Sequence, residues 1–349
     1  MVPVSLLISK SDNQFYKFYS LIFVFMKTRI LGSSGLEVSA IGLGCWGMSG
    51  AYGASSRIES IETIHEAIKN GIDFIDTADI YGNGHNEKLI GEALKNLRHE
   101  IILATKFGFV GGENGELSVN GRPEYVKKAC EDSLRRLKTD YIDLYYLHRL
   151  DKEVPIEDTV GAMSRLVEEG KLRFLGLSEV SALTLEKAVD VHPVAALQSE
   201  YALNTRDVEK SILPACRKNK IALVAFSPLG RGLLTLSLKS NTDLADNDFR
   251  KNIPRFQEEN FNKNIKILSV LEEIARLKNV TPSQISLAWL LHQGDDIIPI
   301  PGMKSRKYIR ENINSVNISL SEDEIEKLDT IFDKISGDRY SRKSSKFID

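Results

Sequence analysis

Four ionisable side chains stand at or just beyond the ends of short apolar runs. Asp76 and Tyr81 follow the run 72–75, Lys106 follows 101–105, and His148 ends 143–148. An apolar strand that ends in an ionisable group places that group at the carboxyl rim of a parallel sheet, where ligands bind. We therefore expect the four side chains to lie together and to form a site for proton transfer.

These residue types suit the reduction of a carbonyl group, which needs a proton donor at oxygen and a hydride from a cofactor. Tyr81 can be the acid, although a phenol with a pKa of ~10 is a reluctant donor near neutral pH. We expect the cation of Lys106 to lower that pKa and Asp76 to hold Lys106 charged. His148 can donate a hydrogen bond that polarises the carbonyl and orients the substrate.

Each of the four residues also has a purely structural interpretation. Asp76 could cap a turn, Tyr81 could be a loop aromatic, Lys106 a solvated strand end, and His148 a hydrogen-bonded core histidine. These interpretations weaken together, because all four residues occupy the same kind of position on consecutive strands. The remaining histidines, His85 among them, have no comparable context and are assigned no catalytic role.

The elements that must hold these residues alternate between strand and helix patterns. A short hairpin is predicted over 28–38, and after it come eight strand-like runs separated by helical periodicity. Eight such units and the hairpin predict an α/β fold, namely a (β/α)8 TIM barrel with an N-terminal β-hairpin. The predicted strands are 40–44, 72–75, 101–105, 141–147, 173–177, 194–197, 221–226 and 297–300.

Helix signals support the same order. Ser56 and Glu59 are spaced as a capping box, Pro123 suits a first helical turn, and another helix begins near Pro155. The polar stretch 236–264 reads as a long loop after the seventh strand, on the face that carries the site. The tail 336–349 is polar and is predicted to be mobile.

Composition excludes several functional classes. The 349 residues are 42% hydrophobic with a net charge of -2, which gives no support for nucleic-acid binding. Three scattered cysteines form no CxxC motif, HExxH is absent, and we predict no metal site. Scattered cysteines suit a reducing compartment, so a cytoplasmic location without membrane association is expected.

The first 25 residues differ from the rest. Two apolar runs there are too short to span a bilayer, and no small-residue cleavage site follows them. We predict that residues 1–25 are a disordered extension or that the native start is Met26. The barrel domain is expected over 26–335.

One glycine-rich motif resembles a dinucleotide-binding motif but does not indicate one here. The segment from Gly42 to Gly47 fits GxGxxG after a strand, which is the pattern of a dinucleotide-binding Rossmann fold. That fold needs a helix to begin at the glycines, whereas the helix pattern here begins only after Ser56. A YxxxK pair is also absent, so we do not predict a Rossmann domain.

The ordered set of motifs resembles the aldo-keto reductase family over residues 26–333. The segments that carry the resemblance are 71–91, 143–148, 176–178, 198–201, 226–232 and 300–302. The resemblance implies a barrel that binds NADP(H) without a Rossmann domain. It also implies that Asp76, Tyr81, Lys106 and His148 are the catalytic residues, in the roles given above.

The resemblance also implies residues for the nicotinamide half of the cofactor. Ser178 and Gln198 occupy the positions that hold the carboxamide, and Phe226 occupies the position that stacks on the ring. The first strand end is expected to line the pocket with Gly44, Cys45 and Trp46.

The adenosine half is assigned in the same way. Pyrophosphate contacts are implied for Ser227, Leu229 and Arg231. After the eighth strand, Lys304 and Arg306 occupy the loop that grips the adenosine 2′-phosphate, with Asn312 near the adenine. Cations there favour NADPH over NADH by charge attraction.

Two positions depart from the family pattern. Glu179 stands where many members have Asn after the serine at the fifth strand end, so the hydrogen bonds to the carboxamide must differ. Arg149 stands where aldose-reductase-like members have Trp, which places a cation in the pocket wall. The segment His148-Arg149-Leu150-Asp151 is more similar to the bacterial, fungal and plant members that reduce varied aldehydes and ketones.

The expected function is NADPH-dependent reduction of aldehydes or ketones, with a small-molecule carbonyl substrate. Two alternatives stay open. One is a non-catalytic NADP(H)-sensing subunit like the potassium-channel β-subunits, which keep the same four residues. The other is a barrel isomerase or aldolase that uses Lys106 as a Schiff-base amine.

Overall fold

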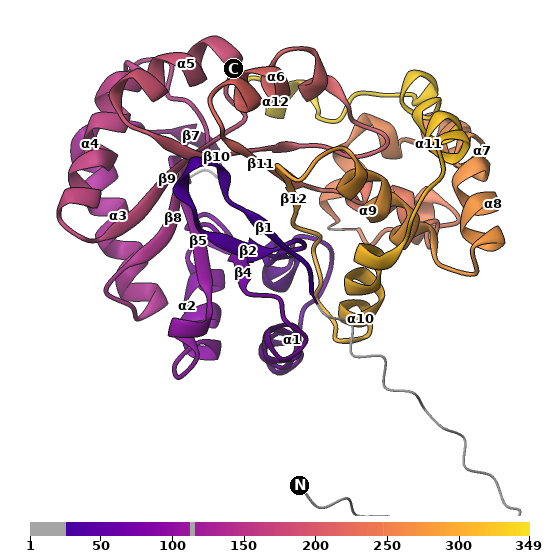
Figure 1. Ribbon diagram of the computed structural model, residues 1–349, viewed down its shortest axis with the longest axis horizontal. Helices are drawn as coiled ribbons and strands as arrows, with labels where there is room; N and C mark the ends of the chain where they lie inside the picture. Colours follow the sequence, from indigo (N-terminus) through magenta and orange to yellow (C-terminus); the bar gives the residue numbers. More distant parts are fainter. Residues whose placement is uncertain (1–25, 112–115, 247) are drawn as a thin grey trace, which may run out of the picture.

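The computed structural model describes residues 26–111, 116–246 and 248–349. Eight parallel strands form one curved sheet in the order β12-β11-β10-β9-β8-β5-β4-β3, which confirms the predicted (β/α)8 fold (Figure 1). The prediction for residues 1–25 lies outside the described residues. The strands are β3 (Leu43–Gly44), β4 (Phe74–Asp76), β5 (Ile102–Phe107), β8 (Ile142–Leu147), β9 (Leu172–Ser178), β10 (Val194–Glu200), β11 (Ala222–Phe226) and β12 (Ile297–Pro299).

The first and last barrel strands meet through backbone contacts that need glycine. The amides of Gly42 and Gly44 donate to the carbonyls of Pro299 and Pro301 over 2.9 and 3.1 Å. A Cβ on Gly44 would lie 2.7 Å from the carbonyl oxygen of Ile300, so no other residue fits there without displacing the backbone. These glycines therefore join the barrel edges, and α1 begins only at Arg57.

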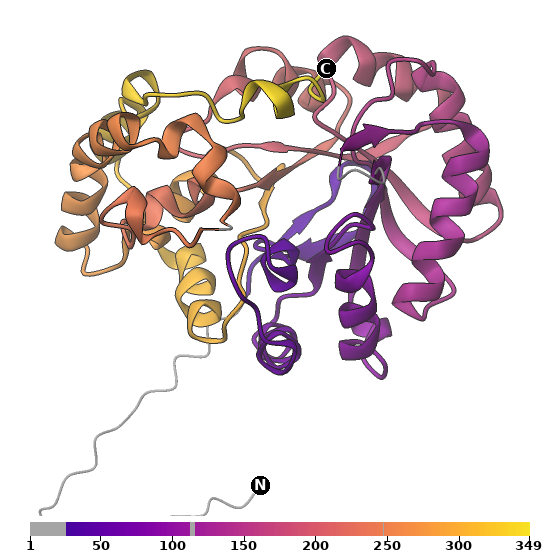
Figure 2. The same ribbon diagram turned by 180° about the vertical axis from the view of Figure 1, so that it is seen from behind.

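Helices cover the outside of the curved sheet, as both views of the ribbon show (Figures 1 and 2). Among the described residues no helix is long and apolar enough to cross a membrane. The helices are α1 (Arg57–Lys69), α2 (His85–Ala93), α3 (Pro123–Leu137), α4 (Ile156–Glu168), α5 (Ala182–Val191), α6 (Ile212–Lys218), α7 (Glu258–Ile267), α8 (Ser269–Leu277), α9 (Pro282–His292), α10 (Lys307–Asn314), α11 (Glu322–Asp329) and α12 (Arg342–Ser345).

The N-terminal hairpin of β1 (Thr28–Ile30) and β2 (Glu37–Ser39) closes the amino-terminal end of the barrel. Leu31 and Val38 are fully buried and belong to the apolar cluster inside the barrel, with Phe74 and Tyr146. A Cβ at Gly32 would lie 2.3 Å from the carbonyl oxygen of Ala195, at the start of β10. Burial of these side chains closes the amino-terminal end of the barrel, so the site can form only at the carboxyl ends of the strands.

Segment 236–264 is more ordered than its composition predicts. It contains three short 3-10 turns (Asn241–Asp243, Phe249–Asn252 and Pro254–Phe256) and the start of α7. Phe249 and Arg250 line the cavity at the barrel rim, so the segment lies on the predicted face. A second hairpin, β6 (Phe109–Gly111) and β7 (Leu117–Val119), extends the same rim.

The tail 336–349 lies across the carboxyl rim, and Figure 2 shows it running from α11 to the C-terminus. Arg339 forms an ion pair with Glu179 at 2.8 Å, and the rings of Phe347 and Phe109 are 5.3 Å apart. Asp349 accepts a hydrogen bond from the amide of Ser181, which precedes α5. The mobility of the tail stays a prediction. The polar sequence of the tail did not indicate these contacts with the rim.

Candidate active site

The centre of the site is a buried ion pair between neighbouring strands. Lys106 on β5 donates to Oδ1 of Asp76 on β4 at 2.5 Å and to the carbonyl oxygen of Thr77 at 2.7 Å. Gln198 on β10 donates to the other oxygen of Asp76 at 2.8 Å. Burial disfavours the Lys106 cation, but Asp76 and Tyr81 outweigh burial and raise the pKa of Lys106, so the amine stays charged.

Tyr81 reaches this pair from the loop after β4. The loop folds back where Asn83, Gly82 and Gly84 have positive φ and where the amide of Gly84 donates to the carbonyl of Asp79. Nζ of Lys106 lies 3.3 Å from the phenol oxygen of Tyr81.

Two opposing effects act on the pKa of Tyr81. Burial raises it above its usual value, and the opposing effect of Lys106 is smaller. Lys106 acts in the expected direction and lowers the pKa, but burial outweighs it. The phenol of Tyr81 is protonated at neutral pH, which is the form that a proton donor needs.

His148 follows β8 and faces Tyr81, with ring centroids 5.9 Å apart. Burial, assisted by the charges of Arg149 and Lys106, holds the pKa of His148 well below its usual value. The ring nitrogen Nδ1 is buried and has no hydrogen-bond partner in the described part of the chain. The imidazole is therefore neutral, so one of its two ring nitrogens carries a hydrogen for donation.

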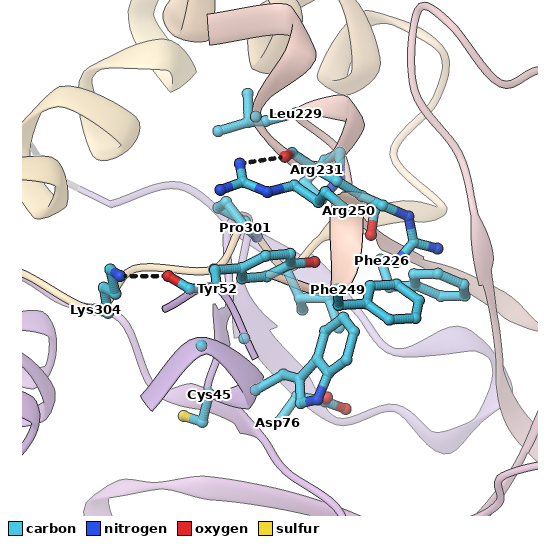
Figure 3. A pocket seen from close by; sticks show the side chains of 18 of the residues that line it. Cys45, Tyr52, Asp76, Phe226, Leu229, Arg231, Phe249, Arg250, Pro301 and Lys304 are labelled. Atoms are coloured by element: carbon cyan, nitrogen blue, oxygen red, sulfur yellow. Dashed lines mark hydrogen bonds between the residues drawn. The ribbon is translucent and has the colours of Figure 1, made fainter. Parts of the chain in front are cut away.

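A cavity of about 820 Å³ opens above these residues. Its lining includes Tyr81 and His148 at the rim and residues at the starts of α9 and α10. Figure 3 shows part of its wall, with Cys45, Phe226 and Lys304 among the labelled residues. Lys106 lies beneath it, fully buried. Of the predicted residues, the cavity is lined by Asp76, Tyr81, His148, Gly44, Cys45, Trp46, Ser178, Gln198, Phe226, Ser227, Leu229, Arg231, Lys304 and Asn312.

The loop after β11 combines unusual backbone geometry with a buried cation. Ser227, Gly230, Arg231 and Gly232 all have positive φ. Arg231 forms an ion pair with Glu200 at 2.8 Å. A left-handed turn of this kind, with a guanidinium, is suited to holding an anion.

Arg306 is the one predicted cofactor residue that does not line the cavity. Its guanidinium forms ion pairs with Glu59 at 3.0 Å and Glu62 at 3.6 Å, on the outer side of α1. Ser56 accepts from the amide of Glu59 as predicted, but the Glu59 carboxylate binds Arg306 and does not complete a capping box. Lys304 instead faces the cavity, where its amine donates to the carbonyl of Tyr52 (Figure 3).

Glu179, the departure from the family pattern, has a partner in the tail. Its Oε1 accepts from Nη1 of Arg339 and from the amide of Glu200, and its Oε2 lies 2.8 Å from Nη2 of Arg339 in an ion pair. Burial works against its charge, but Arg339 and Arg149 outweigh burial and lower the pKa of Glu179. Glu179 is therefore a charged anchor for the tail.

Several cavity residues were not predicted, because they come from segments without a motif. Tyr52 and Phe249 pack their rings against Trp46, at 5.1 and 5.5 Å. Tyr340 in the tail lies over Arg231, with its ring centroid 5.0 Å from the guanidinium carbon. The clustered aromatic residues of segment 236–264 and of the tail are the only signal in the sequence. No group of metal-ligating side chains occurs among the described residues.

Comparison with known proteins agrees with this geometry. The model of the Aldo/keto reductase family matches residues 40–333. Aldo-keto reductase yakc of Schizosaccharomyces pombe, whose name carries NADP(+), is 45% identical over 321 residues, which cover 90% of this chain and 94% of that protein.

Solved structures give the same result. The glycerol dehydrogenase AKR11B4 from Gluconobacter oxydans superposes with a TM-score of 0.80 at 32% identity, covering 88% of this chain and 95% of that one. An aldo-keto reductase from Klebsiella pneumoniae, solved in complex with NADPH, gives a TM-score of 0.68 at 28% identity, with coverage of 88% and 96%.

Proposed function

The chain belongs to the aldo/keto reductase family, and from this premise we propose that it reduces aldehydes or ketones to alcohols with NADPH. One observation carries the proposal. A protonated phenol, that of Tyr81, lies 3.3 Å from a buried ammonium that Asp76 holds charged, at the floor of a cavity.

Tyr81 is the proposed general acid. As negative charge develops on a carbonyl oxygen placed at its hydroxyl, Tyr81 transfers its proton and becomes a phenolate beside the Lys106 cation. Asp76 keeps Lys106 in place, and its own second oxygen is held by Gln198. The stabilisation is therefore greatest after proton transfer has begun, which is when it lowers the barrier.

His148 is proposed to orient the carbonyl. A neutral imidazole donates a hydrogen bond without competing with Tyr81 as an acid. The aromatic rings of Trp46, Phe109 and Tyr81 surround this position, at 4.9 to 5.9 Å from one another or from the imidazole. They exclude water from the reacting carbonyl and strengthen the charge interactions there.

The cavity's lining residues fit an extended dinucleotide. Ser178, Gln198 and Phe226 line the cavity that also holds Tyr81, and the left-handed turn with Arg231 and the side chain of Lys304 line the same cavity. NADPH bound there would supply the hydride to the carbonyl carbon. Lys304 and Lys307, both in the cavity wall, are the proposed cations for the 2′-phosphate, together with Arg306 only if its ion pair with Glu59 opens.

The Schiff-base alternative is not favoured. A nucleophilic amine must be uncharged, whereas the pKa of Lys106 is raised and its ammonium is bonded to Asp76, Thr77 and Tyr81. No observation favours the cofactor-sensing alternative, but turnover distinguishes it from the enzyme.

The test follows NADPH oxidation by the purified protein with a panel of aldehydes and ketones, with NADH in parallel. We expect turnover that prefers NADPH and falls roughly 100-fold or more in Tyr81→Phe, the range that general acids contribute. Binding of NADPH without turnover of any carbonyl would refute the reductase proposal. Equal turnover by Tyr81→Phe would refute the role of Tyr81.

A further inference from the structure

The substrate end of the cavity carries several aromatic rings and one cation. Phe109 and Phe347 pack edge to face at 5.3 Å, and Phe109 also packs against His148 at 4.9 Å. Among these rings lies the guanidinium of Arg149, whose residue is only 7% exposed and lines the cavity. A buried charge among rings costs free energy unless a counter-charge is present.

Within the described residues no carboxylate oxygen lies within 4 Å of the Arg149 guanidinium, although its charge, with that of Arg339, acts on Glu179. Three other arginines of this cluster each lie within 4 Å of a carboxylate oxygen: Arg339 at Glu179, and Arg231 and Arg255 at Glu200. Four arginines thus share two carboxylates. No ion pair of Arg149 occurs in the described parts of the chain.

The hydrogen bonds of Arg149 go to neutral acceptors. Nη1 donates to the carbonyl oxygen of His148 at 2.6 Å and to Oγ of Ser178 at 3.1 Å, and Nη2 donates to the hydroxyl of Tyr340 at 3.4 Å. A guanidinium has five N–H groups, so two remain for another ligand. The fixed bonds orient the guanidinium in advance, which lowers the entropy lost on binding a ligand.

Its position relates it to the reacting carbonyl. The Phe109 ring lies beside both His148 and Arg149, because it packs against the His148 imidazole at 4.9 Å and its centroid is 5.6 Å from the guanidinium carbon of Arg149. His148 also faces the Tyr81 ring. A substrate whose carbonyl contacts Tyr81 and His148 therefore has its substituents near the guanidinium and the surrounding rings.

We propose that Arg149 is a specificity-determining residue that binds a carboxylate on the substrate. This inference rests on the proposed function and deepens it, because it names the substrate class. The class is aldehydes or ketones that bear a carboxylate on an aromatic or apolar body. A carboxylate accepts two N–H groups from one guanidinium and supplies a counter-charge in direct contact with it.

The test compares matched acids and esters. The substrates are 2-, 3- and 4-carboxybenzaldehyde and their methyl esters, which share the reacting aldehyde and differ in charge. The variants are Arg149→Met, which keeps much of the side-chain length, and Arg135→Met, which removes one charge from an exposed position on α3. The readout is the acid-to-ester ratio of kcat/KM for the preferred isomer.

We expect the wild type and Arg135→Met to prefer one acid by roughly 10- to 100-fold, the range for hydrogen bonds to charged groups. Arg149→Met should reduce that ratio to near one, mainly through KM. Partial unfolding of a variant lowers the rates with the acid and with the ester by the same factor, so it cannot by itself produce the expected fall in the ratio. Retention of the acid preference in Arg149→Met, or no acid preference in the wild type, would overturn the inference.

A second readout needs no turnover. Calorimetric titration of benzoate and benzamide into the protein, with and without NADP+, should give tighter binding of benzoate to the wild type and not to Arg149→Met. NADPH affinity is measured on the same variants. A loss of NADPH affinity in Arg149→Met with no change in the benzoate preference would assign the guanidinium to the cofactor and overturn the inference.

The outcomes separate the inference from the proposed function. If the esters are reduced and the acids are not preferred, the role of Arg149 in binding a carboxylate is refuted and the proposed reductase function is kept. Failure of every aldehyde and ketone removes the reductase function, and equal binding of benzoate and benzamide would then remove the assignment of Arg149 as well.

Discussion

The replacement of Lys106 by methionine leaves a buried carboxylate without its cation. Asp76 is only 2% exposed, and the carbonyl of Thr77 loses its donor at the same time. Breaking a buried ion pair from one side costs about 3–5 kcal/mol in the free energy of unfolding. The matched double variant, Asp76→Asn with Lys106→Met, removes both charges and keeps an acceptor for Gln198, so it should recover much of that loss.

The loss in the free energy of unfolding of Lys106→Met should also depend on pH. Burial raises the pKa of Asp76 above its usual value, and Lys106 opposes this effect. In Lys106→Met only the hydrogen bond from Gln198 still opposes burial, so the pKa of Asp76 in the folded state rises further. A carboxyl with a higher pKa when folded binds its proton more tightly in that state, so stability falls as pH rises from the unfolded value of ~3.9 through the folded value.

Urea unfolding at several pH values between about 4 and 8, followed by tryptophan fluorescence and circular dichroism, measures both effects. The single variant should be least impaired at the acidic end, and the double variant should show a weaker pH dependence. A loss of under about 1 kcal/mol at pH 7 in the single variant would mean that Asp76 and Lys106 do not form a buried pair.

Three further outcomes are expected. Because His148 stays neutral over about pH 6–8, kcat/KM for an uncharged aldehyde should show no inflection near the usual histidine value, and a break there would contradict its lowered pKa. Lys304→Met should reduce the NADPH-to-NADH ratio of kcat/KM by roughly tenfold. Arg306→Met should reduce it less, because of these two residues Lys304 alone lines the cavity. The reverse order would show that Arg306 leaves Glu59 to bind the cofactor. Glu179→Gln removes the carboxylate that binds Arg339, so hydrogen exchange in peptides covering 336–349 should accelerate; unchanged exchange would show that this ion pair does not hold the tail.

The barrel and its central site followed from local sequence patterns. Short apolar runs that alternate with helical periodicity predicted the eight strands within a few residues, because strand burial is encoded locally; an ionisable residue at the end of three of these runs predicted the site. Asp76, Lys106 and His148 come directly from these strand ends, and the glycines after Tyr81 fold its loop back to them. The late helix start also distinguished Gly42 and Gly44 from a Rossmann motif.

What the sequence did not predict depends on contacts between distant segments. The interactions of Glu179 with Arg339, and of Glu59 with Arg306, join residues more than 150 positions apart. Charge patterns alone cannot identify such partners. The sequence indicated that Lys106 acts to lower the pKa of Tyr81, but it does not show the burial that raises this pKa.

The central claim is that Tyr81 protonates a carbonyl while NADPH supplies the hydride. The most direct measurement is a single turnover with NADPH deuterated at the transferred position of C4, for wild type and Tyr81→Phe at saturating cofactor and aldehyde. The account predicts deuterium on the carbinol carbon of the alcohol, and a rate roughly 100-fold or more lower in Tyr81→Phe with NADPH binding retained. An alcohol without deuterium, or equal rates in the two proteins, would contradict it.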